Sequence, residues 1–108
     1  MSDYLLIESR DPFECNDAGY YFDLAANLAA KGHRVTVYLV QNAVLVARPC
    51  GQSSRLERLR EAGITVLADD FSLKERGIAS ARLIREVTPA PIDAVVDRLA
   101  AGHKTLWH

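Results

Sequence analysis

The sequence predicts a three-layer α/β/α sandwich built on a mainly parallel sheet of about five strands. Apolar runs of strand type alternate along the chain with segments of helical periodicity. The connections between them are short, and strands that alternate with helices usually pair as parallel neighbours. No linker, low-complexity tract or repeat interrupts the 108 residues, so residues 1–108 are expected to form a single domain.

The first part of the chain is predicted to form two strands around one helix. Residues 4–9 are a hydrophobic run of strand type. Residues 17–31 carry apolar residues at helical spacing, with Asp17 as a possible cap and Gly32 as the residue that closes the helix. Residues 35–40 are rich in β-branched residues and supply the second strand.

A helical turn and a helix are predicted after the second strand. The apolar residues 43–47 are assigned to the turn. Ser54 followed by Glu57 fits a capping box, which begins a helix that runs to Ala62 and closes at Gly63.

Residues 64–78 are predicted to form a buried strand, a sharp turn and a short helix that ends at Gly77. Asp69 and Asp70 stand where the strand gives way to the helix, and an aspartate there most often caps the helix. Ser72, with a glutamate three residues later, also fits a capping box. Because ligands in open α/β sheets collect at the carboxyl ends of strands, this turn is the first candidate site.

The last part of the chain is expected to contain a helix and a terminal strand. Residues 79–88 show no clear pattern and are assigned to a short irregular strand. Pro91 is acceptable in the first turn of the following helix, which Gly102 closes. Residues 104–107 form the last strand. The apolar face of the helix consists of Ile92, Val95, Val96 and Leu99.

Composition excludes several classes of partner. The net charge of -1 gives no electrostatic reason to bind nucleic acid or an anionic membrane. The longest apolar run, residues 35–47, is too short to span a bilayer. No signal-peptide pattern is seen, so a cytoplasmic location is expected, in which Cys15 and Cys50 are free thiols. A small sheet of this length often completes its burial by oligomerising.

Of the two cysteines, Cys50 is the better candidate for a reactive thiol. It precedes a predicted helix N-terminus and has Arg48 and Arg55 nearby in the sequence, and such groups stabilise a thiolate. The alternative is a small apolar residue in a loop. Cys15 is flanked by carboxylates, which disfavour the thiolate, so an incidental role is preferred.

The remaining polar residues carry no metal or cofactor motif. Asp69 and Asp70 could act as an acid/base pair or bind a divalent cation, although capping is the commoner role. His33 follows the first helix, and His103 and His108 are expected to flank the last strand at an exposed terminus. Neither a metal-binding cluster nor a glycine-rich phosphate loop is present, so no cofactor is expected.

Several stretches, in this order, resemble the DsrE/DsrF/DsrH superfamily. Residues 4–9 and residues 29–40 resemble the N-terminal half of DsrE/DsrF proteins. Residues 41–47 match the short apolar segment that follows the second strand in that family. Residues 64–78, with their Lys-Glu-Arg-Gly-Ile ending, are similar to the strand–turn–helix shared by DsrE, DsrF and DsrH. Residues 92–107 resemble the DsrH/TusB end, where the final strand terminates in Trp.

The resemblance implies a cytoplasmic sulfur-relay subunit. Such proteins form homo-oligomers, or hetero-oligomers with related subunits, and can bind a sulfur-carrier protein. In active DsrE-like members a cysteine just after the third strand carries a persulfide. The matching positions here are Asp69 and Asp70, and a carboxylate cannot hold a sulfane sulfur. The candidate pocket at this edge comprises Asp69, Asp70, Cys15 and Asn42.

Three hypotheses follow. The preferred one is a non-catalytic assembly partner of thiol-bearing relatives. The second is a persulfide carrier, resembling a sulfurtransferase, that uses Cys50 as its catalytic thiol. The third is a small-molecule binding module at the carboxyl edge of the sheet.

Overall fold

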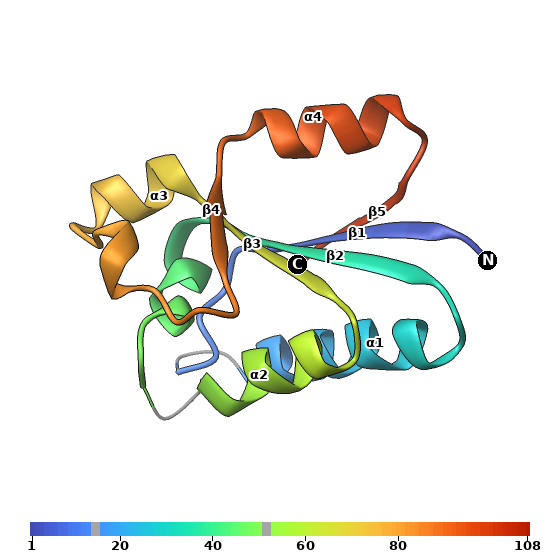
Figure 1. Ribbon diagram of the computed structural model, residues 1–108, viewed down its shortest axis with the longest axis horizontal. Coiled ribbons are helices and arrows are strands. Elements are labelled where there is room, and N and C mark those ends of the chain that lie inside the picture. Colours follow the sequence, from blue (N-terminus) through green and yellow to red (C-terminus); the bar gives the residue numbers. More distant parts are fainter. Residues whose placement is uncertain (14–15, 51–52) are drawn as a thin grey trace.

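A computed structural model describes residues 1–13, 16–50 and 53–108 (Figure 1). One sheet of five parallel strands has the order β4-β3-β2-β1-β5. The strands are β1 (Asp3–Glu8), β2 (Arg34–Leu39), β3 (Thr65–Asp69), β4 (Thr88–Ala90) and β5 (Lys104–Trp107). The helices are α1 (Asn16–Ala30), α2 (Ser53–Glu61), α3 (Asp70–Glu75) and α4 (Asp93–Ala100), with short 3₁₀ turns η1 (Gln41–Ala47) and η2 (Ser80–Arg82).

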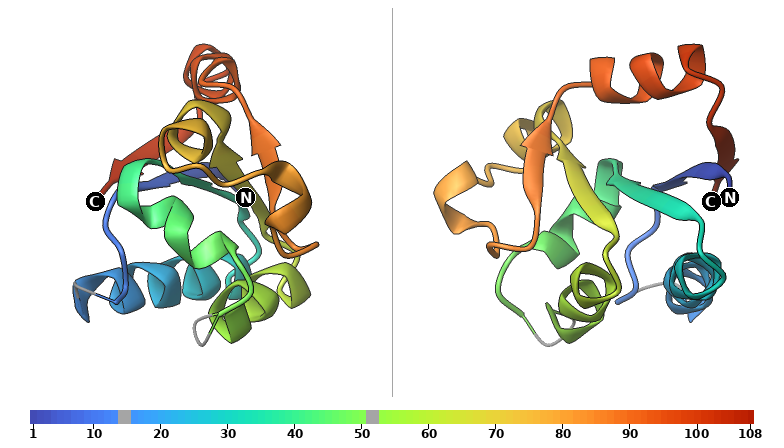
Figure 2. Two further views of the ribbon diagram at one scale, coloured as in Figure 1. Left: turned by 90° about the vertical axis from the view of Figure 1, so that its left-hand side faces the viewer. Right: turned by 45° about the vertical axis from the view of Figure 1, so that its right-hand side comes forward.

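Helices cover both faces of the sheet. α1 and α2 lie on one face and α4 lies on the other (Figures 1 and 2). The connections from β1 to β4 all step the same way across the sheet, so right-handed crossovers keep them on one face. The step from β4 to β5 runs the opposite way, which puts α4 on the other face. The predicted three-layer α/β/α sandwich is therefore confirmed.

The strands alternate between two unequal cores. Toward α1 and α2, residues such as Leu6, Val37 and Val66 are buried in a large cluster. Toward α4, the cluster is small and contains Leu5 and Tyr38. The face under α4 is thinly covered because a single eight-residue helix spans it.

Several helix starts differ from the predicted ones. Asp17 lies in the first turn of α1 rather than before it, and Ser54 lies inside α2, which begins one residue earlier. Ser72 is inside α3, and the cap of that helix is Asp69. A serine three residues before a glutamate can be either a helix cap or an interior residue. In this structure Ser54 and Ser72 are interior residues. The predicted helical turn at residues 43–47 is confirmed as part of η1.

The last part of the chain also differs in detail. Residues 79–88 form no irregular strand; they contain η2 and a loop, and β4 begins only at Thr88. On α4, only Val95 of the predicted apolar face is buried, because the helix rests on the sheet through one side of that face. The terminal strand at residues 104–107 is confirmed. Within the described segments, none of the helices has the length and apolarity needed to cross a membrane.

Candidate functional site

The connections after β3 and β4 diverge to opposite faces of the sheet. Ile78 and Val87, which follow β3, are buried in the core beside α1 and α2, whereas α4 covers the other face. Such a switch point leaves a crevice at the carboxyl ends of its strands, where open α/β sheets bind ligands. A cavity of about 450 Å³ opens here, lined mainly by apolar groups together with Asp70 and Lys74.

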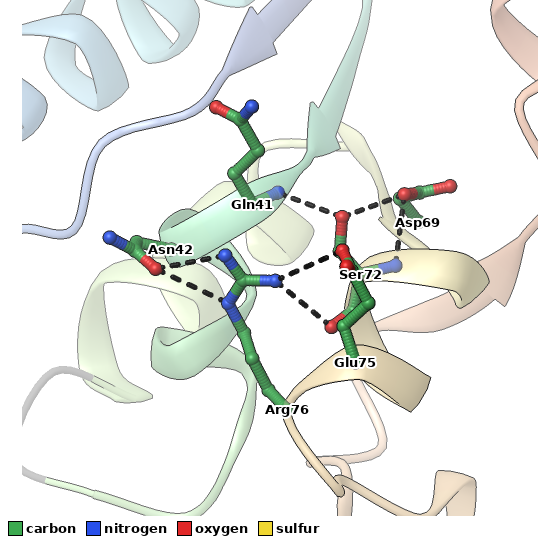
Figure 3. Close-up of polar contacts among 6 residues, drawn as sticks. All are labelled: Gln41, Asn42, Asp69, Ser72, Glu75 and Arg76. Atoms are coloured by element: carbon green, nitrogen blue, oxygen red, sulfur yellow. Dashed lines mark hydrogen bonds and ion pairs between the residues drawn. The ribbon is translucent and has the colours of Figure 1, made fainter.

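The side chain of Asp69 caps α3 at the end of β3. One carboxylate oxygen, Oδ1, accepts a hydrogen bond from the Tyr38 hydroxyl at 2.9 Å. The other, Oδ2, accepts the backbone N–H of Ser72 at 3.0 Å and the Ser72 hydroxyl at 2.7 Å (Figure 3). The residue is only 8% exposed. This carboxylate is therefore fully engaged in holding the strand–helix turn together.

The phenol of Tyr38 is fully buried and links three strands. Its hydroxyl reaches from β2 to Asp69 on β3 and lies 3.1 Å from the carbonyl oxygen of Ala90 on β4. Burial, followed by the hydrogen bond to Asp69, raises the pKa of Tyr38 well above its ordinary value. The neutral phenol thus joins the ends of β2, β3 and β4.

Ser72 connects α3 to the end of β2. Its hydroxyl oxygen accepts the backbone N–H of Gln41 at 2.9 Å while the hydroxyl donates to Asp69 (Figure 3). Gln41 has a φ of 52°, a left-handed conformation that is costly for a residue with a side chain. The strained turn from β2 into η1 is therefore held by a relay from Asp69 through Ser72.

Arg76 ties α3 to η1 a second time. Its Nε and Nη2 donate to Asn42 Oδ1 at 3.2 and 2.9 Å, and its Nη1 donates to the Ser72 carbonyl oxygen at 3.3 Å (Figure 3). Asn42, a predicted pocket residue, thus meets the turn at Asp69 through Arg76 and Ser72. The guanidinium also compensates the C-terminal end of α3, the role expected of a cation there.

Cys50 lies in a different place, in the loop before α2. A cavity of about 440 Å³ is lined by Arg48, Pro49, Cys50 and Arg82. The Cys50 thiol is half-buried, and its sulfur lies 3.8 Å from the Val46 carbonyl oxygen. The second cation beside it is Arg82 rather than the predicted Arg55. Cys15 lies outside the described residues.

The chemistry available at the carboxyl edge is limited by these contacts. Asp69 is occupied, so Asp70 is the carboxylate that faces the cavity at the switch point. Over residues 1–13, 16–50 and 53–108, no group of three His, Cys, Asp or Glu side chains is arranged to hold a metal ion. The edge offers hydrogen bonding and one carboxylate, but the described part contains no thiol at the end of β3.

A buried Glu8–His108 pair at the other end of this edge was not predicted. Glu8 is 0% exposed, and its carboxylate accepts hydrogen bonds from His108 Nδ1 at 2.9 Å and from the Arg10 N–H at 2.7 Å. The His108 ring stacks on Tyr21. The expectation that His108 sits at an exposed terminus is wrong, because β5 pairs with β1 and brings the imidazole onto Glu8. The sequence did contain one signal for this pair: Glu8 is a charged residue at the end of an apolar strand, and a buried charge needs a partner.

Comparison with solved structures shows the fold. The ychN protein from E. coli superposes with a TM-score of 0.89 at 17% identity, covering 100% of both chains. Protein MTH1491 from Methanobacterium thermoautotrophicum gives 0.84 at 19% identity, covering 99% of this chain and 98% of the other. Protein BT1422 from Bacteroides thetaiotaomicron gives 0.83 at 17% identity, covering 99% and 95%. The last two are described as proteins of unknown function.

Comparison with curated proteins gives no match. The profile of the DsrE/DsrF-like family, in contrast, matches residues 4–107 and thus spans both halves of the sequence. The DsrH-like character assigned to the C-terminal half stays a prediction. The chain, from its first strand to its last, belongs to the DsrE/DsrF-like family.

Proposed function

We propose that this chain is a non-catalytic subunit of a DsrE-like sulfur relay. The main support for the proposal is the hydrogen bonding of Asp69. This residue occupies the position where the family resemblance places the relay thiol. Its carboxylate is buried and accepts three hydrogen bonds from Tyr38 and Ser72. A persulfide needs a sulfur nucleophile, so neither Asp69 nor Asp70 can carry one.

An exposed apolar surface supports a role in assembly. The surface, here called the α4–β5 surface, comprises Ile92 at the start of α4, Val96 and Leu99 on α4 and Trp107 on β5, which are 51–71% exposed. β5 is an edge strand, so its outer backbone groups are also unpaired within the sheet. Several exposed apolar residues on one side of a domain are typical of protein interfaces. The proposed partners are a second copy, a thiol-bearing relative or a sulfur-carrier protein, in the cytoplasm.

A sulfur-loading experiment tests the proposal. The purified protein and a thiol-bearing DsrE-like relative are mixed, treated with a sulfane-sulfur donor and examined by native mass spectrometry. We expect a mixed complex in which the added sulfur lies on the relative. The matched control is the Cys15→Ser/Cys50→Ser variant, which should support the same loading. Sulfur transfer that requires a cysteine of this chain would contradict the proposal.

The cavity at Cys50 favours a second candidate function, that of a persulfide carrier. Arg48 and Arg82 line this cavity with the thiol, and guanidinium groups attract an anionic sulfur donor. The test is the rate of Cys50 alkylation against pH. A midpoint near the free-thiol value of about 8.5, together with the absence of a persulfide adduct on Cys50, would reject this candidate.

The cavity at Asp70 favours the third candidate, a small-molecule binding module. Its position at the switch point and its mainly apolar lining suit a small ligand. A thermal-shift screen of metabolites tests it, because a ligand that binds only the folded state raises the melting temperature. A hit whose effect survives Asp70→Asn and Lys74→Gln would place the ligand elsewhere.

A further inference from the structure

A polar cavity lies at the opposite edge of the sheet, where the strands begin. Its volume is about 340 Å³, and its lining includes Asp3, His33, Arg34, Arg98 and His103. These residues come from the amino ends of β1, β2 and β5 and from the end of α4. None of them belongs to the carboxyl-edge site.

Beside this cavity, one buried atom has no partner among the described residues. His103 Nδ1 is buried and makes no hydrogen bond with any residue that the structure describes. The other ring nitrogen, Nε2, lies 4.0 Å from Asp3 Oδ2, which is too long for a hydrogen bond. Buried polar atoms are almost always satisfied by protein, water or a bound group. The cavity itself greatly exceeds the share of one water, about 30 Å³, so it has room for a ligand larger than water.

Among the described residues, the charged side chains leave one cation in the cavity, Arg98, without a counter-ion. Asp3 is neutralised by Arg34, whose Nε and Nη2 donate to its carboxylate at 2.6 and 3.1 Å. Arg98 donates one N–H to a carbonyl oxygen of its own helix at 2.9 Å and, in the described part of the chain, pairs with no carboxylate. A guanidinium carries five N–H groups, so most donors of Arg98 are available.

The neighbouring helix ends explain part of this basic character. Helix C-termini favour nearby cations, and α1, α2 and α4 all end at this edge. Their carbonyl groups, however, are bonded within their own closing turns, for example by the N–H of Ile64 to Leu59 O and of His103 to Arg98 O, both at 3.0 Å. The side-chain donors therefore remain available to a ligand. The backbone N–H of Ser2 also donates to His33 Nδ1 at 3.0 Å, which leaves His33 Nε2 as a donor when the ring is neutral.

We infer that this cavity binds a small molecule that carries a carboxylate or phosphate group. An oxyanion matches the planar donor fork of Arg98 and supplies an acceptor for the Nε2–H of His33. The lining is too polar for an apolar ligand, and two guanidinium groups disfavour a cation.

NMR titration at low salt tests the inference, with inorganic phosphate, acetate and the neutral acetamide as probes. We expect saturable shifts from phosphate and acetate at the Gly63 and Thr65 amides and at the His103 ring nitrogens. Arg98→Gln should weaken binding about ten-fold or more, because a hydrogen bond to a charged group is lost. Arg98→Lys keeps the charge but loses the planar donor fork, so its affinity for phosphate and acetate should lie between those of the wild type and Arg98→Gln.

Arg85→Gln is the matched control, since it removes the same charge from a side chain that is 94% exposed elsewhere. It should leave both titrations unchanged. Three results would overturn the inference: shifts that do not saturate, acetamide binding as well as acetate, or equal binding by wild type and by a folded Arg98→Gln protein. An unchanged melting temperature establishes that the variant is folded.

Discussion

At the residue scale, one carboxylate organises the end of β3. Asp69 holds the first turn of α3, the Tyr38 hydroxyl and, through Ser72, the backbone of Gln41. Replacing it with alanine removes a helix cap and leaves buried donors unpaired, which should lower the free energy of unfolding by about 2–4 kcal/mol. Urea denaturation measures the change.

The adjacent Asp70 provides the matched control for that substitution. Its carboxylate is half-buried and is not the N-cap of α3, so Asp70→Ala should cost less than about 1 kcal/mol. Equal losses from Asp69→Ala and Asp70→Ala would show that the cap does not organise this turn.

Tyr38 should make the fold sensitive to base. Its pKa is raised in the folded protein, so the neutral phenol contributes stability below the ordinary tyrosine value of about 10, and that contribution is lost as the pH rises above it. Between about pH 8 and about pH 11, the melting temperature of Tyr38→Phe should therefore fall less than that of the wild type. Tyr20→Phe, at an exposed position, should behave like the wild type. Parallel curves for all three proteins would contradict this account.

The Glu8–His108 pair gives a further prediction at this scale. Within the described segments, His108→Ala leaves the buried carboxylate with one donor, the Arg10 N–H, and should cost about 3–5 kcal/mol. Glu8→Gln combined with His108→Ala removes the buried charge as well and should cost less than His108→Ala alone. A double-mutant cycle by chemical denaturation measures the coupling. Additive losses would mean that the two side chains do not stabilise each other.

At the scale of elements, α3 is positioned from both of its ends. Asp69 holds its first turn, while Arg76 joins its last turn to Asn42 on η1. This six-residue helix is too short to be stable alone, so its place depends on these side-chain contacts. The carboxyl edge is consequently shaped by a hydrogen-bonded network and not by apolar packing alone.

The turn from β2 into η1 contains a strained residue that can be relieved. Gln41 has a φ of 52°, which costs a non-glycine residue about 1 kcal/mol. Gln41→Gly should therefore raise stability slightly or leave it unchanged, whereas the β-branched Gln41→Val should lower it by about 1–2 kcal/mol. Thermal denaturation distinguishes them. A loss with glycine as large as with valine would locate the effect in the amide side chain.

At the scale of the whole molecule, the two faces of the sheet are unequally covered. The large core lies beneath α1 and α2, while the face under α4 leaves the α4–β5 surface open. Trp107, at 71% exposed, lies on the edge strand of this surface. The molecule therefore has one side that a partner could complete.

Self-association through the α4–β5 surface is the prediction at this scale. Sedimentation velocity of the wild type should show a concentration-dependent oligomer. Leu99→Lys combined with Trp107→Lys should shift it to monomer, because exposed apolar area is replaced by charge. Phe71→Lys, at another exposed apolar position, is the control and should not dissociate it. A wild-type protein that stays monomeric at all concentrations would leave hetero-assembly as the remaining form of the proposal.

The sequence by itself determined the layered fold and the kind of residue at each strand end. Alternating strand and helix periods led to the parallel sheet, and the Asp69–Asp70 turn pointed to the carboxyl edge, because these signals are local in the chain. Asp69 as a cap was predictable from its place between a strand and a helix.

Only the tertiary structure decided what each polar side chain meets. Tyr38 reaches Asp69 across 31 positions, and His108 reaches Glu8 across 100, so no local pattern reports either pair. The tertiary structure likewise places Cys50 beside Arg82. It also leaves three of the four apolar residues on the α4 face exposed. The physical reason is that strand order, which long-range pairing sets, selects the neighbours at each edge, whereas sequence periodicity only selects which elements form.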